Sequence, residues 1–169
     1  MFAPILVLLS GVAFANAYGL KSVSTTSSEQ FTGNWVLQKT AYGALLVGGK
    51  DDAPLTTSVV IEGGKLKLVC PQQATAAFVP TGKDAPAYTV QFVSNTDDLP
   101  KGSIFEGWTT QDDGDKMPDG LTKIVNTKVG LDGSYGLSPV DNANALTWSK
   151  NDNGAHWWMV IDETDDVHC

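Results

Sequence analysis

The chain has 169 residues, a formal net charge of −8, and no Arg among its eleven basic residues. An acidic surface without guanidinium groups repels phosphate backbones and anionic lipid headgroups, so binding to nucleic acid or to a membrane surface is not expected. Charged residues make up only 18% of the chain, and Gly and Pro are spread along it as turn residues. This composition is typical of an all-β domain.

Residues 1–17 are expected to form a signal peptide. The apolar run over 2–14 is shorter than a membrane span, and it leads to Ala15-Asn16-Ala17, the small-x-small pattern of a cleavage site. A secreted, extracellular protein that begins at Tyr18 is the expected product. The Ser- and Thr-rich residues 18–28 are interpreted as a flexible N-terminal arm, and 29–169 as a single domain.

The domain is expected to consist of short strands separated by turn residues. The clearest feature is a hairpin of residues 55–62 and 65–70 around Gly63-Gly64, in which Leu66 and Leu68 face one side and the lysines between them the other. No window of ten residues has a helical period. Further strands are expected at 34–40, 74–80, 87–94, 103–110, 121–129, 135–137, 145–149 and 156–161. Eight or nine such strands indicate a sandwich or a barrel.

The pattern Phe31-x-Gly33-x-Trp35, followed by Leu37, resembles the first conserved element of the lipocalins and related calycins. A long loop and a Gly-Gly hairpin follow in the same order as in that family. The resemblance implies a single antiparallel eight- to nine-stranded β-barrel, with Gly33 and Trp35 as the structural anchor at its floor. The chain lacks the family's Arg, its second conserved element and its C-terminal helix, so it would be an atypical member.

The two cysteines, Cys70 and Cys169, are expected to pair, because an even number of cysteines in a secreted chain favours a disulfide. The bridge would close a loop of about 100 residues. A bridge from a middle strand to the tail is also similar to the one found in lipocalins.

A β-trefoil is the alternative fold. Residues 35–69 and 123–160 can be laid over each other as strand, Gly turn, strand, loop, strand, Gly turn and strand. A trefoil needs a third copy, and 74–120 does not supply a clear one.

The resemblance to lipocalins implies a non-catalytic carrier that holds a small hydrophobic ligand inside the barrel, under a lid formed by loop 42–53. The trefoil alternative implies a lectin or a protease inhibitor that binds a glycan or a protein through its surface loops. The side chains expected to line the interior pocket are Leu37, Leu66, Leu68, Tyr88, Val90, Phe92, Glu106, Trp108 and Trp148.

Glu106 is the carboxylate of greatest interest, because it lies between Ile104 and Trp108 on one face of an expected strand. If that face is inward, Glu106 would be a buried acid that orients a polar ligand or acts in catalysis. If the register is inverted, it is an ordinary surface Glu. A barrel enzyme that uses Glu106 is the third hypothesis for function.

Other chemistry has little support in the sequence. The two histidines, His156 and His168, lie in no nucleophile motif. The acidic loop 112–119 is rich in oxygen ligands but lacks the spacing of a calcium loop. No metal and no cofactor are expected.

Overall fold

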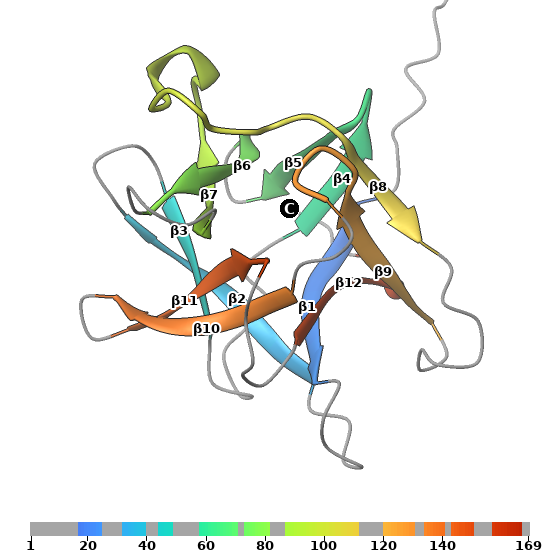
Figure 1. Ribbon diagram of the computed structural model, residues 1–169. Coiled ribbons are helices and arrows are strands. Elements are labelled where there is room, and N and C mark those ends of the chain that lie inside the picture. Colours follow the sequence, from blue (N-terminus) through green and yellow to red (C-terminus); the bar gives the residue numbers. More distant parts are fainter. Residues whose placement is uncertain are drawn as a thin grey trace, which may run out of the picture.

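The computed structural model describes residues 17–24, 32–39, 44–48, 58–70, 73–81, 87–111, 120–130, 134–140, 143–150 and 157–166 (Figure 1). These residues are all-β apart from the short 3-10 helix Thr96–Asp98. Their strands are β1 (Tyr18–Ser24), β2 (Thr32–Lys39), β3 (Ala44–Gly48), β4 (Ser58–Glu62), β5 (Lys65–Cys70), β6 (Ala74–Pro80), β7 (Ala87–Val93), β8 (Trp108–Gln111), β9 (Leu121–Asn126), β10 (Ser134–Val140), β11 (Ala143–Ser149) and β12 (Trp157–Asp166).

Six of the twelve strands, β1, β4, β5, β8, β9 and β12, follow one another around a ring. Antiparallel ladders join β1 to β4, β4 to β5, β8 to β9, β9 to β12 and β12 to β1. Between β5 and β8, the amide of Trp108 donates a hydrogen bond to the carbonyl of Gly64 over 3.0 Å in place of a ladder. The ring is therefore not closed by continuous strand pairing.

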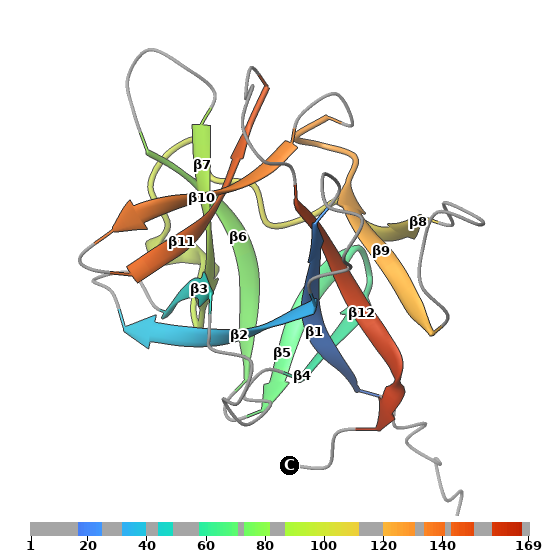
Figure 2. The same cartoon turned by 90° about the horizontal axis from the view of Figure 1, so that it is seen from below.

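The other six strands form three hairpins, β2–β3, β6–β7 and β10–β11. The second strands of these hairpins pair with one another in a triangle, β3 with β7, β7 with β11 and β11 with β3. Figure 2 shows the hairpins gathered on one side of the molecule and the ring strands on the other. The chain thus repeats one four-strand unit three times, as β1–β4, β5–β8 and β9–β12.

This pairing order corrects the expected eight- to nine-stranded lipocalin-like barrel, in which each strand would pair mainly with the next. The described residues form a sheet of twelve strands that includes pairings between non-consecutive strands, such as β1 with β4 and β7 with β11. The predicted hairpin around Gly63-Gly64 is confirmed as β4–β5. Both glycines have positive φ, 59° and 73°, as a tight two-residue hairpin turn requires.

Two segments expected to be irregular contain strands. Residues 18–24 of the expected flexible arm form β1, in which Leu20 is fully buried, and β1 pairs with β2, β4 and β12. The expected lid loop 42–53 contains β3, which pairs with β2, β7 and β11. The longest ladder of β1 is with β12, far away in the sequence, whereas the longest ladder of β3 is with its neighbour β2.

The core is filled by aromatic side chains from several strands around Phe78 of β6. The ring of Phe78 stacks on that of Trp108 at 4.7 Å between centroids, and its neighbours Tyr88, Tyr135 and Trp148 lie at 6.1, 6.3 and 6.4 Å. Phe78 is fully buried, and Trp108 is 2% exposed. Among the described residues, these aromatic rings pack against one another in a single hydrophobic cluster.

Candidate functional site

Most of the side chains predicted to line an interior pocket are brought together, as parts of one hydrophobic core. Tyr88 is partly buried and packs against this cluster. Leu37, Gly33 and Trp35 lie on β2, but the side chains of Leu37 and Trp35 and the burial of Gly33 are outside the described part of the structure. The members of the cluster are Leu66, Leu68, Val90, Phe92, Trp108 and Trp148. The sequence correctly indicated their burial, and Phe78 fills the space among the aromatic rings.

Glu106 is at the surface and not among the core residues. Its carboxylate pairs with the ammonium group of Lys128 over 2.6 Å, and this hydrogen bond and charge lower the pKa of Glu106. Strand β8 begins only at Trp108, because Gly107 has a φ of +92° that interrupts the extended backbone. The expected alternation from Ile104 to Trp108 therefore does not extend through Glu106.

Several predicted features lie outside the described residues. Cys70 ends β5, but Cys169 is outside this set, and the disulfide stays a prediction. The acidic loop 112–119 and both histidines are also outside it. Among the residues that the structure does describe, no three His, Cys, Asp or Glu side chains come close enough to hold a metal ion. No helix there is long and apolar enough to cross a membrane.

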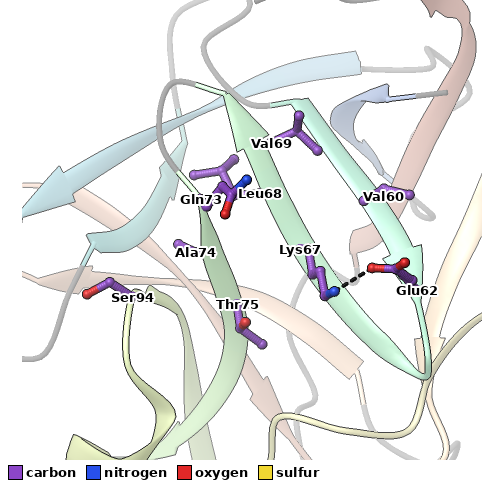
Figure 3. A pocket seen from close by; sticks show the side chains of 9 residues that line it. All are labelled: Val60, Glu62, Lys67, Leu68, Val69, Gln73, Ala74, Thr75 and Ser94. Carbon is purple, nitrogen blue, oxygen red and sulfur yellow. Dashed lines mark hydrogen bonds and ion pairs between the residues drawn. The ribbon is translucent and has the colours of Figure 1, made fainter. Parts of the chain in front are cut away.

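A groove of about 350 Å³ lies on the outer face of the sheet, over β4, β5 and the start of β6 (Figure 3). We call it the β4–β6 groove. It is open to solvent on one side. Its lining residues are Val60 and Glu62 of β4, Lys67, Leu68 and Val69 of β5, Gln73, Ala74 and Thr75 at β6, and Ser94 after β7.

An ion pair between Lys67 and Glu62 forms the charged part of the groove, drawn as a dashed line in Figure 3. The hydrogen bond and the positive charge of Lys67 lower the pKa of Glu62, so this carboxylate stays ionised to a lower pH than an ordinary Glu. The two side chains are 41% and 67% exposed. An incoming molecule can therefore reach both charges.

The uncharged part of the groove divides into aliphatic and polar surfaces. Val60 and Val69 are half-buried, while Leu68 and Ala74 are buried beneath the surface. Gln73 and Ser94 are exposed and Thr75 is half-buried, and they supply an amide and two hydroxyl groups. The groove thus places hydrogen-bonding groups beside a strip of aliphatic carbon, without an aromatic ring among its lining residues.

The same diagonal ion pair occurs a second time in the ring. On β5, Lys67 lies opposite Val60 and pairs with Glu62, two residues further along β4. On β1, Lys21 lies opposite Val160 and pairs with Asp162, two residues further along β12.

The two copies differ in how far neighbouring residues cover them. The side chains of Lys21 and Asp162 are only 19% and 10% exposed, and Val160 is fully buried. Of these two pairs, the one on β4–β5 is open to a ligand.

Sequence reasoning placed Lys65 and Lys67 on the outer face correctly but did not identify the groove. A signal was present in the repeated tripeptide Lys-x-Val, which lies in the first strand of each four-strand unit. It occurs as Lys21-Ser22-Val23, Lys67-Leu68-Val69 and Lys123-Ile124-Val125. Two segments opposite this repeat, Val60-Ile61-Glu62 and Val160-Ile161-Asp162, are also alike.

Comparisons with known proteins give a likeness in fold alone. No protein-family model matches the chain, and no curated protein matches it either. A solved structure described as "CARDS toxin, nicked" is similar, with a TM-score of 0.56 and 10% sequence identity. The match covers 89% of this chain and 26% of that chain, so the present chain corresponds to about a quarter of the toxin chain.

Proposed function

We propose that this chain is a secreted, non-catalytic binding protein with a β-trefoil fold, which holds its ligand on the outside of the sheet in the β4–β6 groove. A β-trefoil consists of a six-stranded ring and three hairpins that meet in a triangle. The threefold repeat of the four-strand unit supports this assignment. The likeness to part of the toxin chain supports the fold and says nothing about activity.

The observation that carries the proposal is the position of Phe78. Its ring occupies the centre of the core and stacks on Trp108, at the place where an interior carrier would hold its ligand. Opening a cavity there would cost the packing of several aromatic rings. The β4–β6 groove, in contrast, is already open and offers charged, polar and aliphatic groups to a ligand.

Secretion is part of the proposal because the expected cleavage site lies just before β1. The cleavage pattern ends at Ala17, and β1 begins at Tyr18. Removal of residues 1–17 would leave all strands of the ring intact. Cleavage is therefore compatible with the folded domain.

The proposal is tested by titrating the protein with palmitate and with benzene while recording tryptophan fluorescence. Trp108 and Trp148 are 2% exposed and report on the core. We expect no saturable quenching, because the aromatic side chains around Phe78 pack against one another in the described core. The variant Phe78→Ala, shown to be folded by circular dichroism, is the positive control and should bind benzene in the cavity that the substitution leaves. Saturable quenching of the unmodified protein by either probe would overturn the proposal and favour an interior carrier.

A further inference from the structure

We infer that the β4–β6 groove binds one sugar unit of a neutral glycan. This inference rests on the proposed function, because it assigns a chemical class to the ligand of the same external groove.

Charge balance points to a neutral ligand. The ammonium group of Lys67 and the carboxylate of Glu62 are already paired, so the groove has no unbalanced charge among its lining residues. A cationic ligand would compete with Lys67 for Glu62, and an anionic ligand would also approach a chain of net charge −8. A neutral ligand meets neither obstacle and leaves the ion pair intact.

The hydrogen-bonding capacity of the groove matches a molecule with several hydroxyl groups. An ammonium group has three N–H donors and a carboxylate has about four acceptor positions, so the single contact between Lys67 and Glu62 leaves both with capacity for a ligand. Gln73, Thr75 and Ser94 add groups that both donate and accept. Each sugar hydroxyl also donates and accepts, so neighbouring hydroxyls can bridge these side chains.

The shape and the aliphatic strip complete the match. A sugar ring carries C–H groups as well as hydroxyls, and Val60 and Val69 present carbon surface beside the polar side chains. The absence of an aromatic ring among the lining residues disfavours a nucleobase or another flat aromatic ligand. The volume of about 350 Å³ is at the lower end of the range for small-molecule sites. One sugar unit would fit, and the open side would let the rest of a glycan extend into solvent.

The experiment uses the methyl glycosides of glucose, galactose, mannose and N-acetylglucosamine as probes. Binding is detected by saturation-transfer NMR and quantified by isothermal titration calorimetry. We expect at least one glycoside to bind, and we expect Glu62→Gln and Lys67→Met to weaken its binding about ten- to a hundredfold, since each removes a charge-assisted hydrogen bond.

The chain offers a matched control in the ion pair of Lys128 and Glu106, whose side chains are 54% and 47% exposed and line no part of the groove. Lys128→Met and Glu106→Gln should leave glycoside binding unchanged. Equal losses of glycoside affinity in the variants of both ion pairs would overturn the inference, because the effect would then come from the general surface charge.

Ionic strength separates a neutral ligand from a charged one. The affinity for a neutral glycoside should change less than about twofold between about 20 mM and about 500 mM salt, because no net charge is buried. Tighter binding of sialyllactose than of every neutral glycoside, with a strong dependence on salt, would overturn the inference. Failure of all four glycosides to bind would also overturn it, whereas the proposed function itself is overturned by saturable quenching with palmitate or benzene.

Discussion

At the scale of single residues, the side-chain amide of Asn126 holds the segment before β8 against the turn after β9. Its Oδ1 accepts hydrogen bonds from the amides of Lys128 and Val129 over 2.9 and 3.2 Å, and its Nδ2 donates to the carbonyl of Glu106 over 3.0 Å. Asn126 is 2% exposed, so these bonds are made away from water. Gly107 lies against Asn126, Thr127 and Lys128, so closely that there is no room for a side chain.

Gly107→Ala is therefore expected to be much more costly than Gly63→Ala. A Cβ atom at Gly107 would lie 2.8 Å from Cγ of Lys128 and 3.1 Å from Oδ1 of Asn126, at a φ of +92°. At Gly63 the φ is +59° and nothing lies within 4 Å of the added atom. Urea denaturation should show a loss of about 1 kcal/mol for Gly63→Ala and about 2–4 kcal/mol for Gly107→Ala. Equal losses of unfolding free energy in the two variants would mean that Lys128 and Asn126 move aside for the added Cβ atom at little cost.

The core residues show what sequence patterns can predict and what they cannot. Alternation along 65–70 correctly predicted that Leu66 and Leu68 face inward and that Lys67 faces outward. The same alternation cannot tell a packed core from a ligand cavity, because both need apolar inward side chains. Phe78 packs among the aromatic rings of the core, and its position depends on three-dimensional packing. The pairing of Lys67 with Glu62 likewise depends on the register of two strands.

At the scale of elements, whether a strand could be predicted from the sequence depended on how far apart the paired segments lie along the chain. The β4–β5 hairpin could be predicted because its two strands are joined by two glycines and its register follows from the turn. Strand β1 could not, because its longest ladder is with β12 at the other end of the chain. The three units have little sequence in common, and the short Lys-x-Val tripeptide is the clearest shared pattern.

We expect β1 to be essential to the fold. A chain that starts at Ala17 keeps β1 and should give the same near-ultraviolet circular dichroism and dispersed NMR spectrum as the full chain. A chain that starts at Thr25 loses the fully buried Leu20 and the ladders with β4 and β12, and it should fail to fold. A folded spectrum from the shorter chain would show that the ring does not depend on β1.

At the scale of the whole molecule, the three units share one core, so a single buried group affects the stability of all of them. Burial raises the pKa of Tyr135 of β10, which is part of the core cluster with residues of the other units. In the unfolded chain a Tyr ionises near pH 10. The folded state therefore holds its proton when the unfolded state has lost it.

The free energy of unfolding should accordingly be constant with respect to this group below about pH 10 and should fall as the pH rises above that value. Tyr135→Phe should reduce this alkaline loss of stability. Urea denaturation at about pH 8 and about pH 11, with Tyr88→Phe as the control, measures the difference. An unchanged loss in Tyr135→Phe would show that another group causes it.

The pairing of β1 with β12 also bears on how the protein forms during synthesis. Lys21 and Asp162, which form an ion pair across these strands, are separated by 141 positions in the sequence. Of the described strands β12 is synthesised last, so the ladder between β1 and β12 can form only after the other eleven strands have been made. Hairpins such as β4–β5 can form earlier, because their partners are adjacent. Until β12 has been synthesised, the edge of β1 that pairs with it must be kept from pairing with other chains.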